Sequence, residues 1–142
     1  MASVRDLLDS KGMAIYSVGP DDPVLDAIKT MAERHVGALL VMKGDELVGI
    51  ISERDYARKV ILLGRASGDT PVSQIMSSPV HTVNPKRTVS DCMRLMTQYR
   101  VRHLPVVENG RVVGVISIGD LVKAVIEDQR QTIEQLEDYI HR

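Results

Sequence analysis

Residues 49–55 read GIISERD, and the same pattern returns at residues 114–120 as GVISIGD. In each copy an apolar segment ends in a serine, and an aspartate follows three positions later. An amphipathic segment comes next in both places. This arrangement predicts a β-strand that leads directly into the N-terminus of a helix, with a hydroxyl and a carboxylate at the junction.

The repetition extends through most of the chain. When residues 18–60 are aligned with residues 83–125, no gap is needed and fourteen of the forty-three pairs are identical. Because one unit of this length cannot cover its own apolar sheet, two units are expected to pack together around a pseudo-twofold axis. The sequence therefore predicts a mixed α/β fold, made by internal duplication of a β-α-β-β-α unit.

The apolar patterns also predict where the elements lie. The strands are expected at residues 15–18, 36–42, 47–51, 80–83, 104–107 and 112–116. Asp22 is expected to cap a helix whose first residue is Pro23. The predicted domains are residues 1–66, which include an N-terminal helix, residues 67–128, and a helical extension over residues 129–142.

The predicted extension keeps apolar residues at spacings of three and four, which is the period of one helix face. These residues are Val122, Val125, Ile126, Ile133, Leu136 and Ile140. A helix that projects beyond its unit with an apolar stripe usually packs against another protein surface. A second copy of the chain is the simplest partner.

The composition excludes several classes of protein. The formal net charge of −1 and the absence of Trp and Phe argue against binding to nucleic acid or to an anionic membrane. No apolar run is long enough to span a bilayer. The single cysteine, Cys92, excludes an intrachain disulfide and favours a reducing compartment. We therefore expect a soluble cytoplasmic protein.

Two interpretations fit the serine–aspartate pairs. In the first, each pair is a capping box that satisfies the free amides of a helix N-terminus. In the second, each carboxylate accepts hydrogen bonds from the vicinal hydroxyls of a ribose, while the helix N-terminus attracts phosphate. The glycine that precedes each pair, Gly49 or Gly114, would let a ligand approach the backbone closely. Ribose, phosphate and an apolar wall together describe a nucleotide.

The doubled unit resembles a pair of cystathionine-β-synthase (CBS) domains, also called a Bateman module. The resemblance runs from Val4 to about Asp128 and includes V-x-P near the start of each unit, LPVV at residues 104–107, and G-h-h-S-x-x-D before each last helix, where h is apolar. The runs SERD at residues 52–55 and RHLP at residues 102–105 resemble stand-alone bacterial members. In that family, two clefts take adenosine ligands, and two modules associate into a flat disc.

This resemblance implies a role for individual residues. Asp55 and Asp120 would hold two riboses, with Ser52 and Ser117 beside them. The adenine would lie against the opposite repeat, at Val36, Gly37, Ala38, Tyr16 and Val115 in the Asp120 cleft and at Val101, Arg102, Pro105, Thr82 and Ile50 in the Asp55 cleft. Arg54, Arg102 and His103 would meet the phosphates.

The resemblance also implies a function and partners. We expect a regulatory module that binds AMP, ADP, ATP or NAD(H) without a metal, forms a homodimeric disc to which the C-terminal helix contributes, and signals to a partner protein that the sequence does not identify. Catalysis is not expected, because the chain has no local nucleophile–base pair, Walker loop or G-x-G-x-x-G motif. Two alternatives remain open, namely an interaction protein whose serine–aspartate pairs are only caps and a binder of S-adenosylmethionine.

Overall fold

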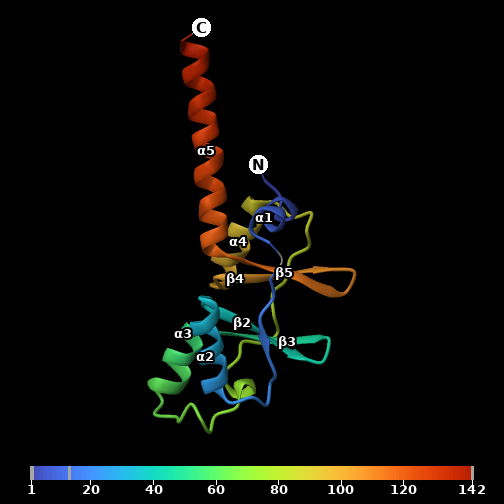
Figure 1. Cartoon of the computed structure of the whole chain (residues 1–142), viewed down its shortest axis with the longest axis vertical. Coiled ribbons are helices and arrows are strands. Elements are labelled where there is room, and N and C mark those ends of the chain that lie inside the picture. The colour runs from blue at the N-terminus through green and yellow to red at the C-terminus, as the bar shows by residue number, and fades with distance from the viewer. Residues whose placement is uncertain (1, 13, 142) are drawn as a thin grey trace. The chain divides into compact units, whose positions relative to one another are not determined.

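The computed structural model describes residues 2–12 and 14–141. The chain divides into two compact units (Figure 1). We call residues 15–81 the central unit, and we call residues 1–14 together with residues 82–142 the terminal unit. Each unit has its own sheet and its own apolar core.

The central unit is built on a three-stranded sheet in the order β1-β2-β3. Its elements are β1 (Ser17–Val18), α2 (Val24–Arg34), β2 (Ala38–Lys43), β3 (Glu46–Ser52), α3 (Glu53–Tyr56), the π-helical η1 (Ala57–Ile61) and the 3₁₀-helical η2 (Val72–Gln74). Strand β1 is parallel to β2, which pairs with β3 in the antiparallel sense. Apolar residues of α2, the sheet, η1 and η2 form the core. Their positions recur with the period of a helix or a strand, so that they lie on one face of each element.

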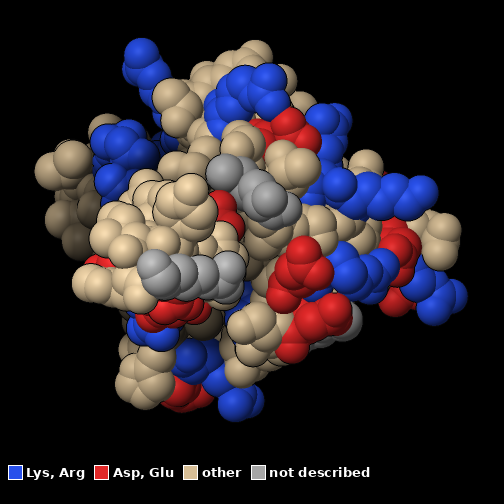
Figure 2. All heavy atoms as spheres, turned by 90° about the horizontal axis from the view of Figure 1, so that it is seen from above, with Lys and Arg blue, Asp and Glu red and all other residues tan. Residues whose placement is uncertain are grey.

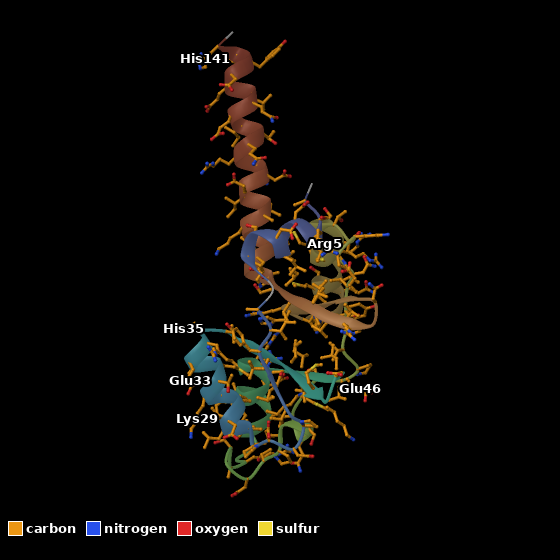
Figure 3. All side chains as sticks on the ribbon, turned by 45° about the vertical axis from the view of Figure 1, so that its right-hand side comes forward. Arg5, Lys29, Glu33, His35, Glu46 and His141 are labelled. Atoms are coloured by element: carbon orange, nitrogen blue, oxygen red, sulfur yellow. The ribbon has the colours of Figure 1, made fainter. Side chains whose placement is uncertain are left out.

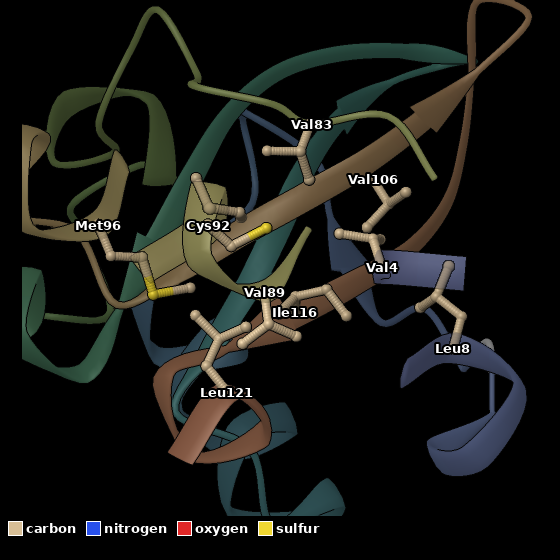
Figure 4. Packing of buried hydrophobic residues seen from close by; sticks show 10 residues of the cluster. Val4, Leu8, Val83, Val89, Cys92, Met96, Val106, Ile116 and Leu121 are labelled. Carbon is tan, nitrogen blue, oxygen red and sulfur yellow. The ribbon is translucent and has the colours of Figure 1, made fainter. Parts of the chain in front are cut away.

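The terminal unit repeats this plan with a two-stranded sheet. Its elements are α1 (Val4–Lys11), α4 (Val89–Tyr99), β4 (His103–Glu108), β5 (Arg111–Ser117) and α5 (Ile118–Ile140). Figure 4 shows side chains of both strands and of α1, α4 and α5 meeting in one core, which includes Leu8, Cys92 and Ile116. Val83 forms a single parallel bridge with Val106. At the equivalent place in the central unit, the short strand β1 pairs with β2.

The two units agree in detail, so the predicted α/β duplication is confirmed. Helices α2 and α4 both end at a residue with left-handed backbone, namely His35 and Arg100, each with φ of 55°. Both hairpins shift register at the same place, between Val41 and Met42 and between Val106 and Val107. The pseudo-twofold packing of the two units stays a prediction.

The leading segment of each sequence repeat packs in the unit that the other repeat builds. The first helix, α1, belongs to the terminal unit, where Val4 N–H donates to Arg87 O at 2.8 Å. The segment η2 belongs to the central unit, where Val72 N–H donates to Asp22 O at 2.8 Å. The boundary predicted at residues 66/67 therefore follows the sequence repeats, whereas the compact units exchange their leading segments.

Several predicted boundaries are wrong. Pro23, not Asp22, is the N-cap of α2, because Oδ2 of Asp22 accepts a hydrogen bond from Gly19 N–H instead of capping the helix. The strand predicted at residues 15–18 is only two residues long, and the one at residues 80–83 is reduced to its bridge at Val83.

The predicted C-terminal extension is part of one continuous helix, α5, which is 23 residues long. Figure 3 shows its side chains projecting on all sides up to His141. The last residue of the predicted extension, Arg142, lies outside the described residues. No helix among the described residues has the combination of length and apolar character that a bilayer crossing requires.

Candidate functional site

The first predicted junction lies between β3 and α3 in the central unit. The Oγ atom of Ser52 accepts a hydrogen bond from Asp55 N–H at 3.1 Å, and Oδ2 of Asp55 accepts from Ser52 N–H at 3.0 Å. The side chain of Asp55 is only 15% exposed, and its Oδ1 atom lies 3.3 Å from Nζ of Lys59, one helical turn later. A largely buried carboxylate is therefore held in a fixed orientation at the helix N-terminus.

The second junction lies between β5 and α5 in the terminal unit and has the same geometry. Ser117 Oγ accepts from Asp120 N–H at 3.2 Å, and Asp120 Oδ2 accepts from Ser117 N–H at 2.8 Å. Here the cation comes from a distant part of the chain. Lys11 Nζ, at the end of α1, donates to Asp120 Oδ2 and to Val115 O, each at 2.7 Å.

Both serine–aspartate pairs are therefore capping boxes, as the first interpretation predicted. The same box occurs at Ser3–Asp6 and at Thr88–Asp91, outside the predicted site. At Asp120 the box and Lys11 use only Oδ2, and no described residue donates to Oδ1. A capping role therefore leaves one carboxylate oxygen able to accept hydrogen bonds from a ligand hydroxyl.

The start of each middle strand lies beside the serine of its own unit. In the central unit, Gly37 O accepts from Glu53 N–H at 3.0 Å, and Ala38 pairs with Ser52. In the terminal unit, Arg102 O accepts from Ile118 N–H at 2.8 Å. His103 pairs with Ser117 in the same way. Each unit thus brings backbone, hydroxyl and carboxylate together, as a site for an adenosine ligand would need.

The sixteen predicted site residues divide equally between the two units. The central unit contains Tyr16, Val36, Gly37, Ala38, Ile50, Ser52, Arg54 and Asp55, and the terminal unit contains Thr82, Val101, Arg102, His103, Pro105, Val115, Ser117 and Asp120. The assignment of each adenine to the opposite repeat stays a prediction.

The role expected for the two glycines is wrong. A Cβ atom on Gly49 would lie 2.4 Å from Sδ of Met76, and one on Gly114 would lie 2.5 Å from Cδ2 of Leu8. The space beside each glycine is therefore filled by a side chain of the same unit. These glycines allow the exchanged leading segments to pack closely on the sheets.

Tyr16 is already engaged within the central unit. Its ring lies 5.2 Å from the guanidinium carbon of Arg34, a cation–π contact, and its carbonyl accepts a hydrogen bond from Leu40 N–H. Arg34, which sequence reasoning did not consider, therefore lies beside one of the predicted site residues.

Charges around Asp120 shift two pKa values. Burial acts to raise the pKa of Asp120, but the hydrogen bonds from Lys11 and Ser117 outweigh it and leave the pKa below its usual value. Burial lowers the pKa of His103, and the charges of Lys11 and Arg102 lower it further, against the opposing effect of Asp120. The Lys11 ammonium therefore bonds to an ionised carboxylate beside a neutral imidazole.

Lys11 is the main residue that sequence reasoning missed. It is separated from Asp120 by 109 positions, so no local motif links them. It also lines an open groove of about 700 Å³ along α1 and α5, together with Asp6, Ser10 and Lys123.

Two further observations concern the polar side chains of the described residues. Within residues 2–12 and 14–141, no buried side-chain nitrogen or oxygen lacks a hydrogen-bond partner. Nor do the described residues include a group of three or more His, Cys, Asp or Glu side chains arranged to hold a metal ion. Oδ1 of Asp120, to which no described residue donates, is therefore not a fully buried atom.

Comparisons with known proteins identify the two repeats. The chain is 42% identical over 147 residues to the mitochondrial CBS domain-containing protein CBSX3 of Arabidopsis thaliana, covering 97% of this chain and 71% of that protein. It is 34% identical over 121 residues to the CBS domain-containing protein YhcV of Bacillus subtilis (strain 168), covering 85% and 84%.

Solved structures agree with these relatives. A CBS-domain protein from Burkholderia ambifaria MC40-6 has 52% sequence identity and a TM-score of 0.88, covering 90% of this chain and 96% of that one. The CBS domain pair of protein MJ0100, solved with 5′-methylthioadenosine and S-adenosyl-L-methionine, shares the fold at 22% identity and a TM-score of 0.80, covering 90% and 98%. The CBS domain model itself matches residues 3–61 and 72–127. The chain therefore belongs to the CBS domain family, and it carries two CBS domains in tandem.

Proposed function

We propose that this chain is a regulatory module that binds an adenosine ligand and passes the binding event to a partner protein through a change in conformation or assembly. The observation that carries the proposal is the doubled junction, in which Asp55 and Asp120 are each held by a capping box beside the start of a middle strand. Ligand control of a partner requires the ligand to bind one arrangement of the module better than another.

The charges favour a phosphorylated ligand, such as AMP, ADP, ATP or NAD(H). In the terminal unit, Lys11 bonds to Asp120, and Lys11 and Arg102 both act on His103. In the central unit, Arg54 lies in α3, directly before Asp55. Cationic donors form charge-assisted hydrogen bonds with phosphate oxygens. S-Adenosylmethionine is a second candidate, because the MJ0100 domain pair binds it and shares this fold.

The proposal can be tested by thermal unfolding with AMP, ATP, NAD⁺ and S-adenosylmethionine, using Asp55→Ala and Asp120→Ala. A ligand at one hundred times its Kd stabilises the chain by about 2.7 kcal/mol. Asp91→Ala is the matched control, because it removes an equivalent capping box on α4. We expect the ligand shift to survive Asp91→Ala and to fall in both site variants. If none of the compounds shifts the transition of the wild-type chain, the serine–aspartate pairs are only caps.

We also propose that α5 pairs with α5 of a second copy. Every residue from Ile126 to His141 is exposed, although the helix carries apolar residues at heptad spacing, namely Val122, Ile126, Ile133, Leu136 and Ile140. Lys123 and Glu137 flank this stripe on the same side. Two antiparallel copies would place each Lys123 opposite a Glu137, so the surface is complementary to itself in charge and in apolar character.

The association can be tested by light scattering during size-exclusion chromatography. Ile133→Asp together with Leu136→Asp should shift the chain toward the monomer, whereas Gln131→Asp together with Gln135→Asp adds the same charge outside the stripe and should not. Equal behaviour of the two double variants would contradict pairing through this stripe. The predicted disc, in which the modules themselves associate, would then be the remaining assembly.

A further inference from the structure

Lys11 is not part of the sequence motif, yet it is the group that contacts Asp120. Its Nζ atom has two acceptors, Oδ2 of Asp120 and the carbonyl of Val115, each at 2.7 Å. Val115 is itself one of the residues predicted to lie beneath the adenine. A ligand that used Asp120 and the backbone at Val115 would therefore meet both partners of this one ammonium.

The backbone of Lys11 is held in place by the packing of α1, whereas its side chain can change position. Val4 and Leu8 anchor α1 in the core, with exposures of 0% and 1%, and Val4 N–H is bonded to Arg87 O. The side chain of Lys11 itself is 36% exposed and borders the open groove along α1 and α5. The backbone is thus fixed close to Asp120, while the four-carbon side chain has room to change its partner.

The two junctions differ in the part of the chain that supplies the lysine beside the aspartate. Lys59, which is 3.3 Å from Oδ1 of Asp55, belongs to the helical segment that follows its own aspartate, and it also donates to Ile75 O at 3.0 Å. Lys11 comes from another element, and its charge and that of Arg102 both act on the imidazole of His103. The Asp120 junction therefore takes its cation from a separate element, whereas the cation at Asp55 follows in the same helical segment.

We infer that Lys11 selects the charge of the ligand at the Asp120 junction. Without ligand, its ammonium neutralises Asp120. When ribose hydroxyls bind to the carboxylate, the ammonium is released toward the 5′ group of the ligand, where it favours a phosphate over a neutral or cationic substituent. This inference rests on the proposed function, because it assigns Asp120 to the ribose.

The test compares the binding of AMP and adenosine by titration calorimetry at one ionic strength. All variants carry Asp55→Asn, which removes the carboxylate of the other junction and leaves the Asp120 junction to be measured. Lys11→Gln removes the charge and keeps most of the length, whereas Lys11→Arg keeps the charge. Lys59→Gln is the matched control, because it removes the corresponding ammonium group from the other junction.

We expect Lys11→Gln to weaken AMP binding about tenfold, as the loss of one charge-assisted hydrogen bond does, and to leave adenosine binding unchanged or tighter. Lys11→Arg should retain the preference for AMP, and Lys59→Gln should change neither affinity. Far-ultraviolet circular dichroism of Lys11→Gln checks that α1 and the rest of the fold are retained. If that variant does not fold, the ratio of AMP to adenosine affinity in Lys11→Arg, at pH values where the phosphate carries one or two charges, provides the same comparison.

The outcomes separate the two proposals. If AMP and adenosine lose affinity equally, or if neither changes, the selective role of Lys11 is overturned while adenosine binding stands. If the wild-type chain binds no adenosine compound at millimolar concentration, the proposed function fails and the role of Lys11 fails with it.

Discussion

Leu8 occupies the space that a side chain on Gly114 would need, since a Cβ atom there would lie 2.5 Å from Cδ2 of Leu8. Gly114 is buried within β5, and Leu8 is a buried residue of α1, with 1% exposure. The absence of a side chain at one position therefore allows the first helix of the chain to pack on the last strand.

We expect Gly114→Ala to destabilise the chain by about 1–3 kcal/mol, the usual cost of overpacking a filled core. Denaturant unfolding measures the effect, and Leu8→Ala in the same chain should recover part of it. Gly119→Ala is the control, because a Cβ atom there meets nothing closer than Ser117 Oγ at 3.6 Å and because alanine favours the helix. An equal loss in Gly114→Ala and Gly119→Ala would contradict the packing role.

The pKa of His103 should report the charge of Lys11. Burial, followed by the charge of Lys11, lowers this pKa from its ordinary value of 6.5, whereas Asp120 opposes the shift. We therefore expect the pKa to rise in Lys11→Ala and to fall further in Asp120→Asn, as measured by NMR titration of the imidazole signals. A pKa that is the same in all three chains would mean that the two charges do not reach His103.

The same shift determines how His103 affects stability. Because the folded-state pKa is lower than that of the unfolded chain, folding favours the neutral imidazole. The stability that the neutral imidazole contributes is fully present above the unfolded-state pKa of about 6.5. It is lost as the pH falls through the folded-state pKa. Chemical denaturation at several pH values should show a smaller loss on acidification in His103→Gln than in the wild-type chain.

Cys92 should be unreactive while the terminal unit stays folded. Its thiol is buried against α1, α5 and the sheet, and burial raises its pKa to about 11. The thiolate, which is the reactive form, is therefore scarce at neutral pH. We expect a thiol reagent at pH 8 to label Cys92 only as fast as the unit opens, so that sub-denaturing concentrations of urea accelerate labelling. Labelling at the rate of a free thiol would contradict this burial.

Removal of residues 1–11 should affect the two units unequally. The deletion takes Val4 and Leu8 out of the core of the terminal unit, whereas no residue of the central core belongs to this segment. We expect faster amide hydrogen exchange at Cys92 and Ile116 and little change at Ala27 and Ile51. Uniform acceleration in both units would instead indicate that they open as one cooperative block.

The sequence was sufficient to predict the duplicated fold, because hydrophobic period and turn residues are local signals. The hairpin at Asn109 and Gly110 is an example, since both residues have the positive φ that a type I′ turn needs, 53° and 77°. The serine–aspartate pairs were equally visible, because a capping box involves residues only three positions apart.

What the sequence did not reveal depends on contacts between distant segments. The ion pair between Lys11 and Asp120 and the packing of Leu8 on Gly114 each join residues more than one hundred positions apart. The glycines were interpreted as openings for a ligand, because a missing side chain does not indicate what fills the space. The single bridge at Val83 was predicted as a strand, because an apolar run does not indicate how many backbone partners it will find.

The exchange of leading segments has a consequence for the order in which the protein folds during synthesis. Residues 15–81 contain every element of the central unit, so this unit can form as soon as they have left the ribosome. The helix α1 is synthesised before the central unit but must wait for β5, which ends at Ser117. The terminal unit therefore closes after the central unit, and a helix that precedes the central unit in the chain is completed by a strand that follows it.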